Sequence, residues 1–122
     1  MAKCILIVDD SMSLRTTLGI ALKSSGYDVV DAVDGKDALT KLDGRKYNLI
    51  ISDVNMPNMD GLTFVKAAKA MPAYRFTPVL MLTTEGDAAK MAEGKAAGVR
   101  AWVIKPFQPP ALLDAVSKLV SA

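Results

Sequence analysis

The stretch IISDVNMPNMDG (residues 50–61) ends a hydrophobic segment on a carboxylate. Two isoleucines and a serine lead directly into Asp53, and a loop containing Asn55, Pro57 and Gly61 follows at once. A strand buried in a protein core has no structural need of a carboxylate, because charged groups are costly to bury. The residues that end the other hydrophobic segments therefore decide what Asp53 is for.

Short apolar segments alternate along the chain with segments of helical period. The apolar segments predict five strands, at residues 4–8, 27–33, 47–52, 79–82 and 101–104. Helical spacing predicts five helices, one around Leu14 to Leu22, then 36–42, 62–71 and 87–97, and a last one around Leu112 to Leu119. This alternation predicts an α/β fold, a doubly wound five-stranded parallel sheet with helices on both faces.

The composition limits the class of protein. A chain of 122 residues with 51% hydrophobic residues fits one compact domain, expected to span residues 1–122 without an output domain. The 15 basic and 13 acidic residues form no dense basic cluster, so nucleic-acid binding is not expected. The lone Cys4 allows no internal disulfide and favours a reducing compartment. No apolar segment approaches the roughly 18 residues of a membrane span, so we expect a cytoplasmic protein without membrane association.

Four of the five predicted strands end on a group that can do chemistry, whereas the second ends without an obvious one. These groups are Asp9 and Asp10 after the first strand, Asp53 after the third, Thr83 and Thr84 after the fourth, and Lys105 after the fifth. The carboxyl ends of parallel strands share one edge of a sheet, where doubly wound folds bind ligands, so these groups are expected to converge.

Converging carboxylates need a cation. Two carboxylates about 4 Å apart repel by roughly 4 kcal/mol at an effective dielectric constant of about 20. Oxygen ligands, in a chain without histidine, favour Mg²⁺ over zinc or copper. Because Mg²⁺ usually takes one or two carboxylates together with a phosphate oxygen, the pattern points to a phosphoryl ligand.

With these residues together, the chain resembles the receiver domain of bacterial two-component response regulators, and is most similar to the stand-alone CheY-like chemotaxis type. The resemblance covers the whole chain. Its motifs are Asp9 and Asp10, Asp53 with the MPNMDG loop (residues 56–61), Thr83, and Lys105 followed by Pro106. It implies a flavodoxin-like (βα)5 fold with strand order 2-1-3-4-5, and a cis peptide bond between Lys105 and Pro106.

The resemblance also implies roles for the residues at the strand ends. Asp53 is expected to be the phosphoacceptor, a carboxylate nucleophile that takes a phosphoryl group from a histidine kinase. Asp10, Asp53 and the backbone carbonyl of Asn55 are expected to bind Mg²⁺, with Asp9 acting largely through water. Lys105 is expected to pair with a carboxylate or a phosphoryl oxygen.

A second set of residues is expected to read and tune the phosphorylated state. The Thr83 hydroxyl is expected to sense the phosphoryl group by a hydrogen bond. Trp102 stands at the switch position, where the family usually has Tyr or Phe. Asn55 and Glu85 stand at the positions that tune loss of the phosphoryl group, and they predict a short-lived phosphorylated state. Thr84 stands where a small residue is usual, and we expect it to slow access by a phosphodonor or a phosphatase.

The expected moving parts are the loop after Thr83 and the helix at residues 87–97, where Gly86, Gly94 and many alanines provide little anchoring bulk.

The implied function is a phosphorylation-activated switch that promotes its own phosphorylation and dephosphorylation, and is not an enzyme acting on external substrates. Its expected partners are a histidine kinase, a possible phosphatase and a flagellar motor switch protein. The last is expected to bind through the fourth helix, fifth strand and fifth helix. A phosphorelay partner is the alternative.

Two other classes share part of the pattern. A phosphohydrolase of the haloacid dehalogenase kind also uses an Asp nucleophile, a Thr, a Lys and Mg²⁺, but it needs an acid–base Asp two residues later, where this chain has Asn55. A flavodoxin-like FMN binder needs hydroxyls and amides in its phosphate loop, where this chain has Asp9 and Asp10. Both classes therefore fit less well than a receiver domain.

Overall fold

A computed structural model of the chain describes residues 3–84 and 88–120. The strands are β1 (Cys4–Val8), β2 (Asp28–Ala32), β3 (Leu49–Asp53), β4 (Val79–Thr83) and β5 (Ala101–Ile104). The helices are α1 (Met12–Ser24), α2 (Gly35–Lys41), α3 (Gly61–Ala70), α4 (Ala88–Ala97) and α5 (Pro109–Val120), with a short 3₁₀ helix, η1 (Pro72–Tyr74), before β4.

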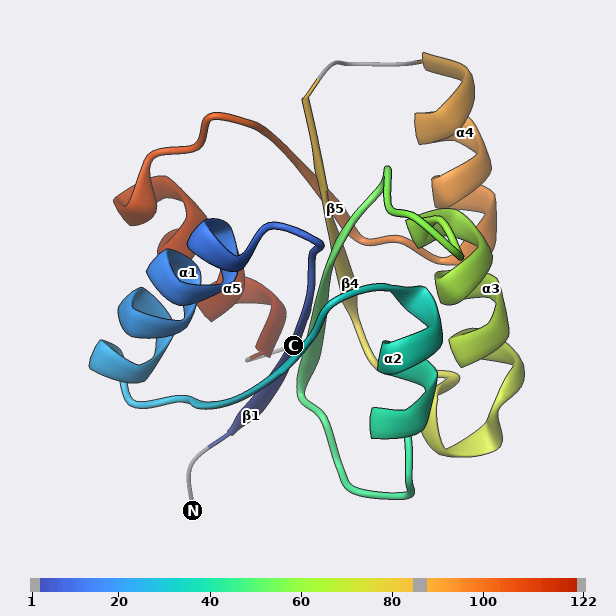
Figure 1. Ribbon diagram of the computed structural model, residues 1–122, viewed down its shortest axis with the longest axis horizontal. Helices are drawn as coiled ribbons and strands as arrows, with labels where there is room; N and C mark the ends of the chain where they lie inside the picture. Colours follow the sequence, from blue (N-terminus) through green and yellow to red (C-terminus); the bar gives the residue numbers. More distant parts are fainter. Residues whose placement is uncertain (1–2, 85–87, 121–122) are drawn as a thin grey trace.

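The strands form one parallel sheet in the order β2-β1-β3-β4-β5. In the register, Ile51 of β3 lies between Ile7 of β1 and Leu80 of β4. Helices α1 and α5 cover one face of the sheet, and α2, α3 and α4 cover the other (Figure 1). The predicted fold class and strand order are confirmed.

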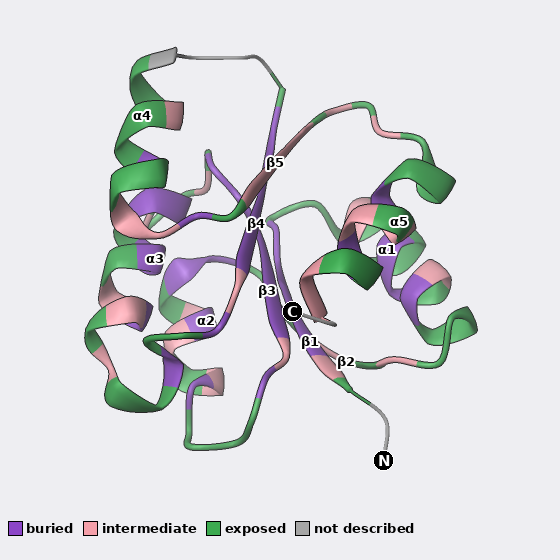
Figure 2. Cartoon of the chain, turned by 180° about the vertical axis from the view of Figure 1, so that it is seen from behind, coloured by how far each residue is buried: buried purple, intermediate pink, exposed green. Residues whose placement is uncertain are grey.

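The core consists of two hydrophobic clusters, one on each face of the sheet. Along β1, Leu6 belongs to the cluster under α2, α3 and α4, whereas Ile5 and Ile7 belong to the cluster under α1 and α5. This alternation follows from the two-residue period of a strand. Strands β3 and β4 are buried along their whole length, as expected of central strands covered on both faces (Figure 2).

Most predicted boundaries of strands and helices hold. The largest difference is at the start of β3, and it has a local cause. The predicted strands at residues 4–8 and 101–104 coincide with β1 and β5. The strand predicted to begin at residue 47 begins instead at Leu49. Asn48 offers its side-chain Oδ1 to the Cys4 N–H at 3.0 Å, and Tyr47 donates its hydroxyl to the Lys41 carbonyl at 2.8 Å. Side chains thus add to a single backbone bond, from the Asn48 N–H to the Cys4 carbonyl at 2.8 Å, where the strand was expected to begin. The η1 turn was not predicted.

Three helices that follow strands begin on side chains that cap them. Ser11 Oγ accepts a hydrogen bond from the Leu14 N–H at 3.2 Å at the start of α1. Asp34 and Asp60 begin α2 and α3 in the same way, each capping an N–H three residues later. These caps fix how the chain turns at the carboxyl edge of the sheet, so they also position the residues at the strand ends.

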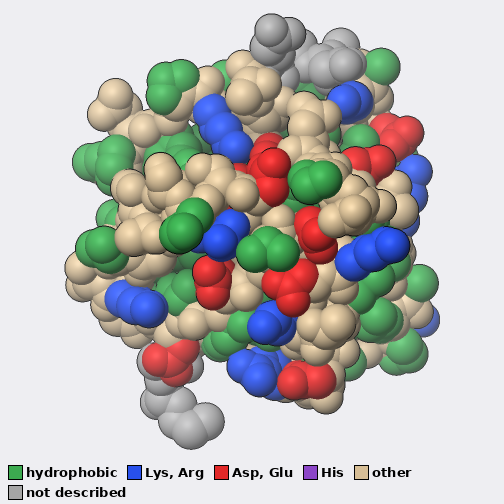
Figure 3. Space-filling view, viewed as in Figure 1, with side chains coloured by type: hydrophobic (Ala, Val, Ile, Leu, Met, Phe, Trp, Pro, Cys, Tyr) green, Lys and Arg blue, Asp and Glu red, His purple; other side chains and the backbone are tan. Residues whose placement is uncertain are grey.

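In the part of the chain that the structure describes, every helix is too short or too polar to cross a membrane. On the face seen in Figure 3, acidic and basic side chains are interspersed, in keeping with a net charge of +2.

Candidate functional site

Three carboxylates meet at the carboxyl edge of the sheet. Asp53 is the last residue of β3, and Asp9 and Asp10 follow β1. One carboxylate oxygen from each lies within 4.8 Å of the others. Asp9 is fully buried at 0% exposure and Asp53 is 7% exposed, whereas Asp10 is exposed to solvent. The strand ends therefore converge as the sequence predicts, with one of the three groups accessible from outside.

Lys105 lies between two of these carboxylates. Its Nζ is 3.0 Å from Asp9 Oδ2 and 3.4 Å from Asp53 Oδ2. Its backbone N–H donates to the Thr83 carbonyl at 2.7 Å, which fixes the end of β5 against the end of β4. The peptide bond between Lys105 and Pro106 is cis, as the resemblance implies.

The buried Asp9 is held by groups from α1. Its Oδ1 accepts the Ser11 N–H at 2.8 Å, and its backbone carbonyl accepts Arg15 Nη1 at 2.6 Å. Arg15 also pairs with Asp31 of β2 at 3.1 Å. Sequence reasoning missed Arg15, because only the pairing of β1 with β2 reveals that Asp31 and Asp9 lie within its reach.

The electrostatics of the cluster favour a further cation. Burial raises the pKa of Asp53, the negative charge of Asp9 raises it further, and Lys105 opposes both effects. Ionising Asp53 therefore costs folding free energy while the cluster holds a single ammonium. Three carboxylates supply the hard oxygen donors that a divalent cation such as Mg²⁺ prefers, so the residues present could hold one.

The other predicted residues that follow β4 differ in how far they are buried and described. Thr83 ends β4 and is 6% exposed, so it reaches the same edge of the sheet. Thr84 is exposed and lines a cavity of about 400 Å³ together with Leu14, Lys105 and Phe107. Glu85 lies outside the described residues.

Trp102 lies farther from the carboxylates, in the middle of β5. Its side chain is partly buried and packs against the hydrophobic cluster under α2, α3 and α4. The indole covers Gly94 of α4 so closely that a Cβ on Gly94 would overlap it. The aromatic ring thus points inward against α4 in this structure.

Two contacts of the loop after β3 were also missed. Lys90 of α4 donates to Asn55 Oδ1 at 3.1 Å. Asp34 follows β2 and accepts the Asn58 amide at 2.8 Å. This contact and the backbone N–H of Asp37, which is the larger cause, hold the pKa of Asp34 below its ordinary value. The expectation that the second strand ends without a chemical group is therefore wrong, because Asp34 stands two residues beyond β2.

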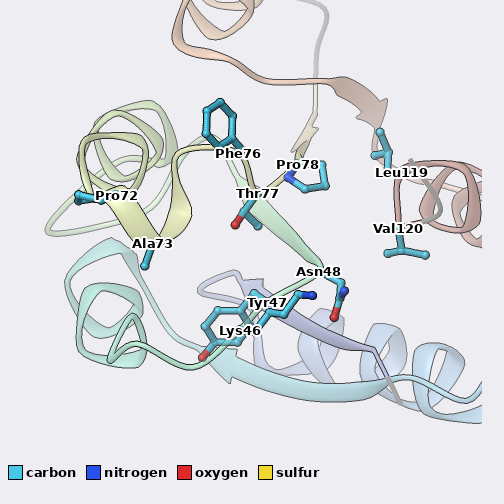
Figure 4. Close-up of a pocket in the computed structure, with 10 residues that line it drawn as sticks. All are labelled: Lys46, Tyr47, Asn48, Pro72, Ala73, Phe76, Thr77, Pro78, Leu119 and Val120. Atoms are coloured by element: carbon cyan, nitrogen blue, oxygen red, sulfur yellow. The ribbon is translucent and has the colours of Figure 1, made fainter. Parts of the chain in front are cut away.

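A separate cavity of about 300 Å³ lies at the opposite, amino-terminal edge of the sheet (Figure 4). Its lining includes Tyr47, Thr77 and Leu119, and it includes none of the residues predicted for the site. The polar chemistry of the described residues thus concentrates at the carboxyl edge.

Comparisons with known proteins agree with this geometry. A model of the response regulator receiver domain family matches residues 5–117. The chain is 39% identical over 112 residues to chemotaxis protein CheY1 of Helicobacter pylori, covering 90% of each chain. It is 36% identical over 112 residues to protein PilG of Pseudomonas aeruginosa, covering 92% of this chain and 83% of that one.

Solved structures lead to the same conclusion. The structure of Vibrio cholerae chemotaxis protein CheY4 matches with a TM-score of 0.94 at 45% identity, covering 98% of this chain and 99% of that one. The flavodoxin-like parallel sheet with an acidic pocket at its carboxyl edge defines a CheY-like signalling domain, a class that serves as a phosphorylation switch. The chain belongs to the response regulator receiver domain family.

Proposed function

We propose that this protein is a phosphorylation-activated switch of chemotaxis signalling. It takes a phosphoryl group from a histidine kinase on Asp53, with Mg²⁺, and its affinity for a flagellar motor switch protein then changes. The observation that carries the proposal is the meeting of Asp9, Asp10 and Asp53 within 4.8 Å, with Lys105 Nζ 3.4 Å from Asp53. The chemotaxis names of CheY1 and CheY4 support the choice of pathway.

In the proposed reaction, an Asp53 carboxylate oxygen attacks phosphorus, an O–P bond forms, and the P–N bond to the kinase histidine breaks. Phosphoryl transfer depends mainly on positioning and on neutralising the oxygens. Lys105 is placed to neutralise one side, because its ammonium can pair with either a carboxylate or a phosphoryl oxygen. Buried Asp9 holds that ammonium at 3.0 Å.

Asp10, Asp53 and the Asn55 backbone carbonyl are the proposed ligands of Mg²⁺, with Asp9 acting largely through water. Bound Mg²⁺ would neutralise charge on the carboxylates and on the phosphoryl oxygens. The raised pKa of Asp53, caused first by burial and then by the charge of Asp9, supports this assignment, because a bound cation would favour the ionised carboxylate.

The phosphoryl group would then be sensed by Thr83 and Lys105. Each can donate a hydrogen bond to a charged acceptor, worth about 1.5 to 3 kcal/mol. Their sum of roughly 3 to 6 kcal/mol is comparable with the roughly 5.5 kcal/mol needed to move an equilibrium from 1:99 to 99:1. In our proposal the change passes to α4, β5 and α5, with Trp102 as the aromatic switch residue.

Asn55 and Glu85 are proposed to tune loss of the phosphoryl group, which makes the phosphorylated state short-lived. Thr84 is proposed to slow access to Asp53, and its exposed position beside Lys105 in the cavity of about 400 Å³ supports this. A phosphorylated state that persists for many hours in Mg²⁺ would contradict the proposed role of Asn55 and Glu85. Unchanged phosphorylation kinetics in Thr84→Ala would contradict the role of Thr84.

Phosphorylation itself is tested with a small-molecule phosphodonor. We expect the intact mass to rise by one phosphoryl group when Mg²⁺ is present, and not after chelation of the metal. Asp53→Asn should abolish the gain, whereas Asp43→Asn, at the opposite end of α2 from Asp34, should leave it unchanged. A mass gain that survives Asp53→Asn would refute the assignment of the phosphoacceptor.

The choice of partner is tested by titrating an N-terminal peptide of a flagellar motor switch protein, with Mg²⁺ and with or without beryllium fluoride as a phosphoryl mimic. Marked tightening with the mimic supports a switch at Asp53 and a chemotaxis role. Absence of binding in both states, in protein shown to take up the mimic, would favour a phosphorelay intermediate instead.

A further inference from the structure

The loop that carries Asn55 is tied to the neighbouring loop after β2 by a partly buried hydrogen bond. Asn58 Nδ2 donates to Asp34 Oδ2 at 2.8 Å, and Asp34 is only 8% exposed. Both oxygens of this carboxylate are used, because Oδ1 accepts the Asp37 N–H at 2.8 Å and begins α2. Asp34 therefore joins a rigid helix end to the middle of the loop between β3 and α3.

The backbone of this loop has an unusual conformation at the contact. Asn58 has φ of 69°, in the left-handed region that most side chains avoid and that Asn adopts more readily than most. Next to it, Met59 packs against Gly35, where an added Cβ would lie 2.8 Å from Met59 Cγ. The two loops thus fit together through a hydrogen bond and a close apolar contact.

The ends of the loop are closed as well. The Gly61 N–H donates to the Val54 carbonyl at 2.8 Å, and Asp60 caps α3. The proposed metal ligand, the carbonyl of Asn55, lies inside this closed loop, three residues before Asn58. Pro57 restricts the intervening backbone further, since its ring fixes φ. A change at Asn58 is therefore transmitted to Asn55 through a short, stiff segment.

We propose that Asp34 is a positioning residue for the metal site: through Asn58 it fixes the β3–α3 loop, and with it the Asn55 carbonyl, in the arrangement that binds Mg²⁺. The inference rests on the proposed function, which supplies the metal. Residues that orient the ligands of a metal typically change its affinity about 10- to 100-fold when they are replaced. Asp34 acts through the loop, so we expect the lower end of that range.

The test is a calorimetric titration with Mg²⁺ alone, together with the thermal unfolding midpoint of the metal-free protein. Asp34→Ser should keep the helix cap, because Ser caps as well as Asp does, but it leaves no second oxygen to accept the Asn58 amide. Asn58→Gly keeps the left-handed backbone and the net charge while removing the amide. Each change should weaken Mg²⁺ binding by about tenfold.

Two further variants separate geometry from charge. The double variant Asp34→Asn with Asn58→Asp exchanges donor and acceptor and keeps the net charge, so it should recover most of the lost affinity. Asp43→Asn removes one carboxylate after α2, where it pairs with Arg45 at 3.3 Å. It should leave the affinity close to that of the unmodified protein, because it lies away from the loop.

The outcomes are distinguishable. Lower unfolding midpoints with unchanged Mg²⁺ affinity in Asp34→Ser and Asn58→Gly would show a structural role alone and overturn the inference. Failure of the exchanged pair to recover affinity would overturn it too. If the unmodified protein itself shows no Mg²⁺ binding, or if Asp10→Asn leaves the binding intact, the proposed metal site fails and the inference fails with it.

Discussion

Helices α3 and α4 lie side by side on the same face of the sheet, yet they are held in different ways (Figure 1). Five residues of α3 are buried: Gly61, Leu62, Phe64, Val65 and Ala68. Among the α4 residues whose burial the structure describes, Gly94 alone is buried. Helix α3 is held by large apolar side chains, whereas α4 packs through a glycine that lies under an indole.

The burial of the two helices distinguishes a firmly held part of this domain from a part that can move. α3 begins directly after the loop that carries Asn55, and Gly61 packs beneath the carbonyl of Asp53. α4 follows β4, which ends on Thr83, and it buries little apolar area. An element that buries little area shifts at little cost in free energy. The comparison therefore supports the proposal that α4 moves while α3 stays fixed.

The largest expected effect tests the anchoring of α3. Phe64 is 0% exposed, so Phe64→Ala should lower the free energy of unfolding by about 3 to 5 kcal/mol. Met91 of α4 is only partly buried, and Met91→Ala should cost about 1 kcal/mol or less. Denaturant titrations of both variants measure the difference. Equal losses would remove the contrast between the helices.

Gly61 of α3 and Gly94 of α4 give the next largest effect. A Cβ on Gly61 would overlap the Asp53 carbonyl, which is backbone and cannot move aside, so Gly61→Ala should destabilise the protein by about 1 to 3 kcal/mol. A Cβ on Gly94 meets the Trp102 ring, which can rotate away. Gly94→Ala should therefore change stability by less than about 1 kcal/mol, while shifting Trp102 fluorescence toward that of an exposed indole.

Gly19 of α1 is the matched control, since nothing lies within 4 Å of its Cβ position. Gly19→Ala should stabilise the protein by up to about 1 kcal/mol through helix propensity, and leave the fluorescence unchanged. An unaltered Trp102 spectrum in Gly94→Ala would show that the indole does not depend on this glycine.

A smaller effect is expected at the start of α3. Asp60 accepts the Thr63 N–H at 2.8 Å, so Asp60→Ala should cost about 1 kcal/mol. Asp60→Asn keeps a capping oxygen and should cost only a few tenths of that. Thermal unfolding of the two variants separates the cap from the charge. A loss of equal size in both would assign the effect to the carboxylate charge.

The smallest expected effect concerns the ion pair between the two helices. Lys66 of α3 and Glu93 of α4 lie 3.4 Å apart, and their side chains are 54% and 50% exposed. An exposed pair of this kind contributes roughly 0.2 to 1 kcal/mol, and salt screens it. A double-mutant cycle with Lys66→Ala and Glu93→Ala measures the coupling. A coupling well above that range, insensitive to salt, would mean that α4 is held more firmly than its burial indicates.

The sequence allowed the fold and the central site to be predicted because both depend on local patterns. Apolar period and turn residues predicted the strands, and the groups at the strand ends converged as expected. The start of β3 was placed two residues early, at residue 47, where the side chains of Tyr47 and Asn48 make contacts with other segments. The hydrogen bonds of Arg15, Asp34 and Lys90 were not predicted, because each joins residues of two different elements or loops. Their roles depend on which loops become neighbours.

The α/β class, the expected edge of the sheet and the types of group gathered there follow from the order of residues, because periodicity and strand ends are properties of consecutive residues. Which carboxylate is buried, which is exposed, and which oxygen Lys105 contacts depend on the packing of distant segments. The same packing decides that Asp34 meets Asn58 and that Trp102 lies on Gly94. Burial and contact arise when distant segments pack, and they set the desolvation and charge that shift the pKa of Asp53.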